Sequence, residues 1–147
     1  MRSEKSAGAV IFYLHDKEPI FLMLKYPNYW GFVKGLIEPG EEEHETARRE
    51  AKEEANLSKL KFVEGFKHII KYFFKFKGEA ISKEVVFFLA EVSREEAKKV
   101  KISHEHNDFQ WLNFNSSIKI IKHKNEKEIL EAADNFLEEY SKQKRLF

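Results

Sequence analysis

Residues 35–57 read GLIEPGEEEHETARREAKEEANL, and the fold prediction starts from this stretch. Its first part, from Gly35 to Gly40, also contains Pro39, and such a composition is typical of a loop. From Glu43 to Leu57 there is neither Gly nor Pro, and the abundant Ala, Glu, Arg and Lys favour a helix. Asn56 lies where this helix ends, because Asn tolerates the left-handed backbone of a helix stop. We therefore predict a loop that leads into a helix.

The predicted helix is strongly acidic. Between Glu41 and Glu54 there are seven Glu residues and three Lys or Arg residues, a local charge of −4 before His is counted. Glu50, Glu53 and Glu54 follow the i, i+3, i+4 spacing, so they project from one side of the helix, where like charges repel. A hard divalent cation such as Mg²⁺ prefers oxygen ligands and would compensate this repulsion. The alternative is an ordinary solvated helix face, which is what most acidic runs are.

Two features favour a cleft over a solvated face. The acids follow a loop in which Gly35, Pro39 and Gly40 control the backbone direction, so that a carbonyl group can join the carboxylates. Ala47 and Ala51 lie on the same helix, and small residues allow it to pack closely against a sheet. The helix is then half buried and its acids line a cleft.

The rest of the chain mixes strands and helices without an internal repeat or a linker. We predict a short extended piece at residues 30–34, a short helix after Ser116 and a final helix capped by Asn125, with Ile129 to Tyr140 supplying its apolar stripe. Apolar runs predict strands at residues 7–14, 20–26, 61–77 (with a bend near Gly65), 84–92 and 108–112. One domain that spans residues 1–147 with an α+β fold is the natural interpretation.

Composition narrows the class of protein. The chain has 147 residues, of which 42% are hydrophobic and 35% are charged, so it is long enough to bury a core. Its longest apolar run, residues 7–14, is too short to cross a bilayer. The absence of cysteine excludes disulfides and thiolate chemistry. A net charge of +1 argues against a long nucleic acid as partner. We expect a cytoplasmic protein that has no membrane partner.

Residues 35–57 resemble the Nudix box. That pattern is Gly, five residues, Glu, seven residues, Arg-Glu, an aliphatic residue, any residue, Glu-Glu, any residue, Gly and an aliphatic residue. The chain departs from it at Asn56, where the family has Gly, and Ala51 is smaller than the usual aliphatic residue. The positions that match in register are Gly35, Glu41, Arg49, Glu50, Ala51, Glu53, Glu54 and Leu57. The resemblance implies an α/β/α sandwich, in which a mixed sheet lies between helices and the box forms loop, helix and loop.

The resemblance also implies a chemistry. Nudix proteins hydrolyse a nucleoside diphosphate linked to another group, and they use Mg²⁺ or Mn²⁺. Carried over by position, Glu50, Glu53 and Glu54 bind the metal and the Gly35 carbonyl assists. Arg49 and Glu41 form an ion pair with a structural role in the loop.

Pieces outside the box resemble one branch of this family, the asymmetrical diadenosine tetraphosphate hydrolases. The resemblance covers most of residues 6–137 and implies Mg²⁺-dependent hydrolysis of diadenosine tetraphosphate, a small dinucleoside polyphosphate, to ATP and AMP. The pieces are residues 30–35, 63–67, 88–92, 103–106 and 111–112.

The same resemblance assigns residues beyond the box. Glu105 is expected as a further metal ligand or as the base that activates water, and Glu53 is the other candidate base, so that Glu50, Glu53 and Glu105 are the catalytic candidates. Tyr72 is expected to stack on adenine. Lys34 and Lys83 are expected to contact the polyphosphate. Phe109 stands where the family often has Tyr; it can stack on a base, but it cannot donate a hydrogen bond.

Several alternatives stay open at this point. Tyr72 lies among Phe73, Phe74 and Phe76, and such aromatic groups are mostly core. His104 and His106 could hold zinc, although no third ligand is evident. A related reaction is removal of pyrophosphate from a triphosphorylated RNA 5′ end. The fold could also serve as a non-catalytic nucleotide sensor. The sequence does not define the oligomeric state.

Overall fold

The computed structural model describes residues 2–103, 106 and 108–145. Its strands are β1 (Arg2–His15), β2 (Glu18–Lys25), β3 (Trp30–Gly31), β4 (Val33–Leu36), β5 (Lys61–Phe62), β6 (His68–Phe76), β7 (Glu79–Glu91) and β8 (Asp108–Leu112). Its helices are α1 (Glu43–Ala55), α2 (Arg94–Ala97), α3 (Phe114–Ile120) and α4 (Lys124–Arg145). None of the described helices is both long enough and apolar enough to span a membrane.

The sheet is mixed, as expected. β1 and β7 run parallel at its centre, and β1 also pairs antiparallel with β2 and β4. β2 continues to β3 and β8, whereas β5 and β6 pair with β7. The β1–β2 turn is Asp16-Lys17, and both residues have positive φ, which fits the right-handed twist of a hairpin.

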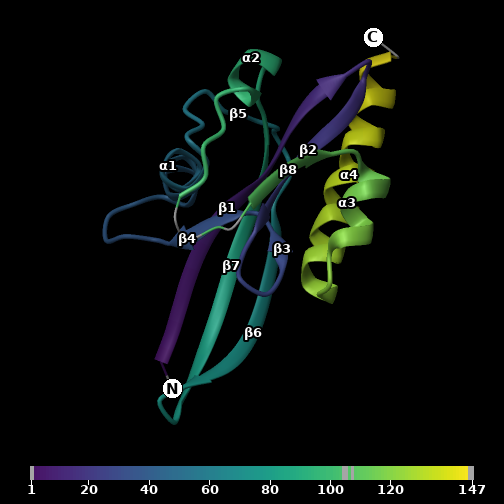
Figure 1. The fold of residues 1–147 in the computed structure, drawn as a ribbon. Helices are drawn as coiled ribbons and strands as arrows, with labels where there is room; N and C mark the ends of the chain where they lie inside the picture. The colour runs from purple at the N-terminus through teal and green to yellow at the C-terminus, as the bar shows by residue number, and fades with distance from the viewer. Residues whose placement is uncertain (1, 104–105, 107, 146–147) are drawn as a thin grey trace.

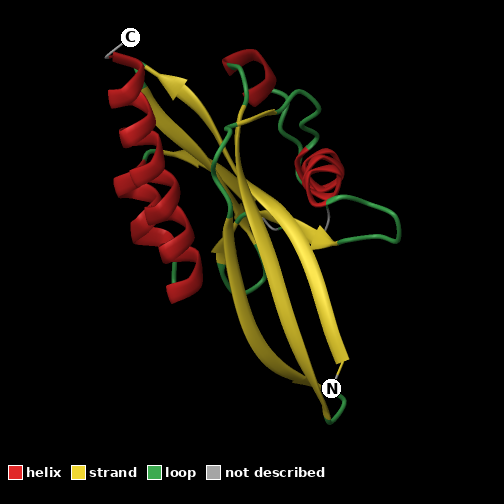
Figure 2. Cartoon of the chain, turned by 180° about the vertical axis from the view of Figure 1, so that it is seen from behind, coloured by secondary structure: helices red, strands yellow, loops and turns green. Residues whose placement is uncertain are grey.

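Helices cover both faces of the sheet, which gives the predicted α/β/α sandwich (Figure 1). α1 packs on one face through Ala47, Ala51 and Ala55, each fully buried against strand residues such as Val33 and Val86. α4 packs on the opposite face through Ile129, Leu130, Ala133 and Leu137. Figure 2 shows that β1, β6 and β7 extend well beyond the helices toward the N-terminus.

Several predicted boundaries need correction. β1 begins at Arg2, five positions before the predicted start at Ala7, because its polar first residues pair with β7 from Ile81 onward. The predicted strand over residues 61–77 is two strands, separated where Gly65 has a φ of +94°. The final helix starts at Lys124, so Asn125 lies inside its first turn rather than at the cap.

Other boundaries differ by less. β7 begins at Glu79 and ends at Glu91, so it is longer than the predicted 84–92 on its N-terminal side. The helix expected after Ser116 begins at Phe114, because the Asn113 side chain accepts a hydrogen bond from the Ser116 N–H at 2.9 Å. The prediction for residues 108–112 is confirmed, and so is the end of α1, since Asn56 adopts φ 59° and ψ 33°.

Candidate active site

The loop that precedes α1 is held to the helix by Glu41. Its Oε1 accepts hydrogen bonds from the Glu38 N–H at 3.0 Å and from the Thr46 hydroxyl at 2.7 Å. Its Oε2 accepts one from Arg49 Nε at 2.7 Å. The bond from Arg49, with those from Glu38 and Thr46, lowers the pKa of the Glu41 carboxyl to about 2. The ion pair expected between Glu41 and Arg49 is therefore present.

Arg49 also contacts two of the three acids expected to bind metal. Its Nη1 lies 2.8 Å from Oε1 of Glu50 and 3.2 Å from Oε2 of Glu53, and its Nη2 donates to the Leu36 carbonyl at 2.9 Å. The hydrogen bond to Glu41 is the main cause that raises the pKa of Arg49 above its usual value. One guanidinium thus connects the loop, strand β4 and the acidic side of α1.

Glu50 and Glu54 are buried, whereas Glu53 is exposed. Glu50 lies directly against Gly35, where a Cβ would overlap its carboxylate, so only glycine leaves room for the acid there. Glu54 accepts a hydrogen bond from the Lys34 backbone N–H at 3.1 Å. The end of β4 and the middle of α1 therefore meet at these two carboxylates.

These side chains line a cleft of about 540 Å³. Its lining residues are Lys34, Gly35, Leu36, Glu38, Arg49, Glu50, Glu53, Glu54 and Ser103. Within residues 2–103, 106 and 108–145, no three Asp, Glu or His side chains converge closely enough to form a ready ligand set. The cleft nevertheless offers three carboxylates, one of them directly against Gly35, and this all-oxygen donor set fits a hard divalent cation such as Mg²⁺ or Mn²⁺.

The expected phosphate and base contacts lie on the α4 face of the sheet. Tyr72 and Lys83 are register partners between β6 and β7. The Lys34 backbone borders the acidic cleft through its hydrogen bond to Glu54, whereas its side chain points to the α4 face, because Val33 before it packs toward α1 and side chains alternate along a strand. Burial and the charge of Lys83 lower the pKa of Lys34, while Glu126 and Glu54 oppose that effect. Lys34, Tyr72 and Lys83 therefore lie on one face of the sheet, where Lys83 Nζ also lies 3.5 Å from the Glu4 carboxylate.

Two expected site residues are not part of this group. Phe109 is half-buried on the α1 face, where it packs against the core with Trp111, so it lies across the sheet from Tyr72. The structure therefore gives no support for Phe109 as a substrate contact in this group. Glu105 and His104 lie outside the described residues. His106 is buried, with its Nδ1 3.2 Å from the Ser103 hydroxyl.

A set of aromatic residues was missed by the sequence analysis. The rings of Tyr26 and Tyr29 stack with centroids 4.7 Å apart, and Tyr29 meets His123 edge-on at 5.5 Å. Tyr26 also meets His106 edge-on at 4.4 Å, and Lys34 Nζ lies 5.9 Å from the Tyr26 ring centroid. Burial raises the pKa of Tyr29 to about 12. Both tyrosines flank the Pro27-Asn28 turn, and this turn is the local feature of the sequence that could have pointed to the aromatic set.

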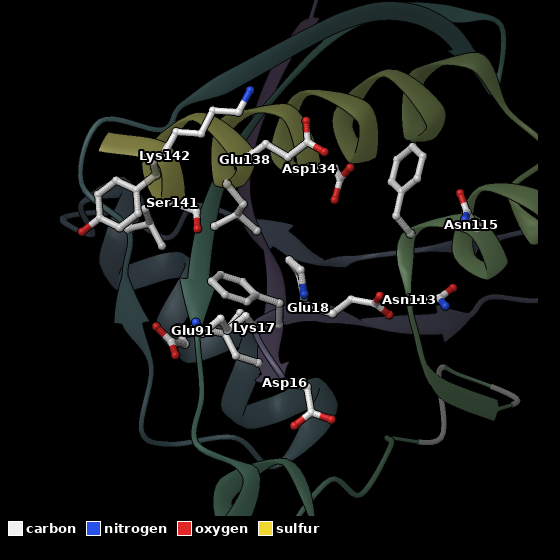
Figure 3. Close-up of a pocket in the computed structure, with 17 residues that line it drawn as sticks. Asp16, Lys17, Glu18, Glu91, Asn113, Asn115, Asp134, Glu138, Ser141 and Lys142 are labelled. Atoms are coloured by element: carbon white, nitrogen blue, oxygen red, sulfur yellow. The ribbon is translucent and has the colours of Figure 1, made fainter. Parts of the chain in front are cut away.

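A larger cleft, of about 690 Å³, lies elsewhere, between the β1–β2 turn and the C-terminal half of α4 (Figure 3). Its lining includes Asp16, Glu18, Asp134 and Lys142 but no residue of the 35–57 stretch. We therefore do not choose the candidate active site by volume. The smaller cleft is the candidate, because the acids and the arginine of the motif line it.

Comparison with known proteins agrees with this geometry. The model of the NUDIX domain matches residues 4–133. Bis(5′-nucleosyl)-tetraphosphatase [asymmetrical] from Mus musculus is 31% identical over 144 residues, which cover 90% of this chain and 95% of the mouse protein. The protein of the same name from Sus scrofa is 34% identical over 122 residues, which cover 80% of each chain.

A solved structure is similar as well. The crystal structure of a C. elegans Ap4A hydrolase binary complex superposes with a TM-score of 0.78 at 33% identity, and the match covers 91% of this chain and 97% of the other. The family model, these relatives and the loop–helix geometry of residues 35–57 agree, and the chain belongs to the Nudix family.

Proposed function

We propose that this chain is a metal-dependent pyrophosphohydrolase that acts as one domain, residues 1–147, and splits diadenosine tetraphosphate into ATP and AMP. The observation that carries the proposal is the cleft in which Glu50, Glu53 and Glu54 lie next to Lys34. An acidic region beside a lysine suits a polyphosphate that is bound together with a divalent cation. Relatives that match most of the chain bear the name of this activity.

We assign Glu50, Glu53 and Glu54 as the side chains that would hold Mg²⁺ or Mn²⁺, with the Gly35 carbonyl and Glu105 as further candidates. Such a cation, when bound, neutralises phosphate charge and lowers the pKa of an attacking water. Arg49 keeps Glu50 and Glu53 in place through hydrogen bonds of 2.8 and 3.2 Å. Burial of Glu50 and Glu54 further restricts their rotamers.

We assign the phosphate and base contacts to the α4 face. Burial is the main cause that lowers the pKa of Lys34, and the charge of Lys83 adds to this effect. Two such cations are stabilised by an anion between them, which suits a polyphosphate chain. Tyr72, opposite Lys83, and the ring pair of Tyr29 and His123 offer ring faces or edges for a nucleobase.

Glu53 or Glu105 accepts the proton of the attacking water in this proposal. Glu53 is exposed at the mouth of the cleft, where a water molecule has access. Single Gln variants separate the two residues, because the variant that lacks the base loses kcat while its affinity for the divalent cation changes little. The other variant lowers the affinity for the cation.

The test is incubation of the purified chain with diadenosine tetraphosphate and Mg²⁺, followed by chromatography of the products. Equal amounts of ATP and AMP, and no reaction in EDTA, support the proposal. Two molecules of ADP, or no cleavage at all, contradict it.

Two other functions remain as alternatives for the same cleft. A short RNA with a 5′-triphosphate that releases pyrophosphate faster than the dinucleotide is cleaved would favour the RNA reaction. Binding without turnover would favour a nucleotide sensor. The cytoplasm is our proposed location for this chain.

A further inference from the structure

β6 is an edge strand that carries exposed apolar side chains. Within the described residues it pairs with β7 alone, and no described loop forms a backbone hydrogen bond to it. Ile69, Phe73 and Phe76 are 46%, 70% and 53% exposed. The end of the sheet that contains this strand extends beyond the helices (Figure 2). A long apolar edge without cover is a surface along which another strand can pair.

The sequence of β6, HIIKYFFKF, places its exposed side chains in an alternating order. Tyr72 packs with the core on the α4 face, and side chains alternate along a strand. The α1 face of the strand therefore carries Ile69, Lys71, Phe73 and Lys75. Apolar and basic side chains thus follow one another along this face.

This order selects one register for an antiparallel pair of β6 strands. A pair centred on Tyr72 matches all nine residues of the strand, and it places Lys71 opposite Phe73 and Lys75 opposite Ile69 of the second copy. A pair centred on Phe73 would place Lys71 opposite Lys75. A pair centred on Lys71 would place this lysine opposite its own copy. Like charges directly opposite each other are destabilising, so the lysines exclude the two neighbouring registers.

The selected register also suits the chemistry of its cross-strand pairs. A lysine can lay its alkyl chain along an aromatic ring and keep its ammonium group over the ring or in water. Lys71 Nζ lies 3.6 Å from the Glu84 carboxylate of β7, so part of its charge is balanced when a second copy approaches. A contact in which the same strand serves both copies closes about a two-fold axis.

We propose that two copies of this chain pair antiparallel along β6, with Tyr72 at the two-fold axis, and form one continuous sheet. Both α4 faces then lie on the same side of that sheet. Because Tyr72 is also the proposed base contact, the dimer brings two base contacts next to each other, a consequence that rests on the proposed function. The dimer itself does not depend on it.

The first test measures the mass of the native chain by sedimentation equilibrium in buffer without substrate. We expect twice the chain mass of 17.5 kDa, and dissociation into single chains on dilution. The mass of a single chain at every concentration up to the solubility limit overturns the proposal. Since no substrate is present, the result is the same whether or not the chain cleaves the dinucleotide.

Phe73→Lys and Phe73→Glu test the register by charge. Phe73 is exposed in the single chain, so neither variant should unfold it. Lysine at this position faces Lys71 of the second copy at two symmetric places, whereas glutamate faces the same lysine with the opposite charge. The Kd of the dimer is therefore expected to be at least about tenfold higher in Phe73→Lys than in Phe73→Glu. Equal Kd values, or a higher value in Phe73→Glu, overturn the register.

Leu14→Lys is the matched control. It introduces the same charge at another exposed apolar residue, near the end of β1, and should leave the Kd of the dimer unchanged. If Leu14→Lys weakens the dimer as much as Phe73→Lys does, the added charge and not β6 is responsible, and the proposed interface is wrong.

Chemical cross-linking locates the axis independently. The native chain has no cysteine, so a single-cysteine variant carries one thiol. Tyr72→Cys places two thiols directly opposite each other, and a short bis-maleimide is expected to join them into a covalent dimer on a denaturing gel. The exposed Phe76 lies four residues from the axis, so the two thiols of Phe76→Cys are about 26 Å apart and should not be joined. Efficient cross-linking of Phe76→Cys, or none of Tyr72→Cys in a chain that sediments as a dimer, overturns the register.

Discussion

Arg49 and Glu41 form a two-point ion pair, with Nε to Oε2 at 2.7 Å and Nη2 to Oε1 at 3.1 Å. Such bidentate geometry requires the planar guanidinium, because an ammonium group acts as a point charge. The remaining nitrogen, Nη1, lies 2.8 Å from Glu50. The ion pair that shapes the loop therefore also sets the position of a proposed metal ligand. Loss of this ion pair should lower both the stability and the activity of the chain.

Arg49→Lys is expected to lower kcat/KM for the dinucleotide by at least about tenfold, the loss that accompanies about 1.4 kcal/mol of lost transition-state binding. The melting temperature should fall as well. Arg48→Lys is the control, since Arg48 is the neighbouring residue and donates instead to the Leu60 carbonyl at 3.1 Å. Kinetics and thermal melts of both variants test this prediction. Equal loss of activity in Arg48→Lys would show that the helix, and not the ion pair, is responsible.

The pH dependence of stability follows from Glu41. Because Arg49 and its other donors lower the pKa of Glu41 to about 2 in the folded chain, the folded state favours the ionised carboxyl. The resulting stabilisation is fully present above the unfolded pKa, about 4.3, and it is lost as the pH falls toward the folded value. Glu41→Gln should therefore be less stable than the native chain at pH 7, and the difference should shrink toward pH 2.

Urea denaturation in EDTA at a series of pH values measures this difference without metal. Glu42→Gln, next to Glu41, is not a suitable control, because the Glu42 side chain accepts a hydrogen bond from the Glu45 backbone N–H in the capping box of α1. Glu95→Gln on α2 is preferable, because Glu95 is exposed. A constant difference between Glu41→Gln and the native chain from pH 7 to pH 2 would refute the assigned role.

Gly35, in β4, and Gly40, in the loop that follows this strand, allow a matched comparison. A Cβ at Gly35 would overlap the carboxylate of Glu50, so Gly35→Ala should displace that acid and lower kcat at least about tenfold, as expected for a misplaced catalytic group. A Cβ at Gly40 meets no atom within 4 Å, but its φ of +81° strains any other residue. Gly40→Ala should cost about 1–2 kcal/mol of stability and leave kcat nearly unchanged.

Initial rates and denaturation curves of the two glycine variants check the comparison. We expect Gly35→Ala to lose activity and Gly40→Ala to lose stability. Similar kcat values in both variants would mean that Glu50 has room to move without effect on the reaction.

The sequence predicts the local parts of this fold well. The composition of residues 43–55 and the tolerance of Asn56 for positive φ correctly locate α1 and its end. The apolar run at 108–112 correctly locates β8. The first residues of β1 could not be predicted in the same way, because Arg2 to Lys5 are polar and extend only through pairing with β7, whose residues lie about eighty positions later in the chain.

The candidate site likewise has one part that the local sequence predicts and one part that it does not. Helical spacing identifies Glu50, Glu53 and Glu54, since their relationship is local. The positions of Tyr29, Tyr72 and His123 depend on the sheet register and on where α4 begins, and no local pattern contains that information. Phe109 is a residue that its type suggests for base stacking, but β8 directs its ring to the other face of the sheet.

Glu53→Gln and Glu54→Gln are each expected to reduce turnover by several orders of magnitude while the fold stays intact. The exposed Glu53 gives up only a contact of 3.2 Å to Arg49, and Gln at position 54 can still accept the hydrogen bond from the Lys34 N–H. Circular dichroism and product chromatography of both variants are the measurements, with Glu128→Gln, at an exposed position of α4, as the control. A near-normal rate in either folded variant would refute its assignment as a metal ligand.

Asn56 replaces the glycine of the family pattern, and its substitutions separate backbone strain from side-chain contacts. Its φ of 59° is costly for most residues, by about 1–2 kcal/mol. Its side chain accepts from Lys52 Nζ at 2.9 Å and donates to the Lys99 carbonyl at 3.0 Å. Asn56→Ala puts a residue that tolerates this backbone conformation less well at the same φ and loses both contacts, so the free energy of unfolding should fall by about 1–2 kcal/mol.

Asn56→Gly relieves the strain while it loses the same two contacts, each worth about 0.5–1.5 kcal/mol at most and less at this accessible position. The two effects oppose each other, so the glycine variant should remain within about 1 kcal/mol of the native chain. Turnover should be unchanged in both variants, because residue 56 lies beyond the last acid of α1. Urea denaturation and initial rates provide the comparison. If the glycine variant is less stable than the alanine variant, the left-handed backbone conformation does not determine which residue is favoured at position 56.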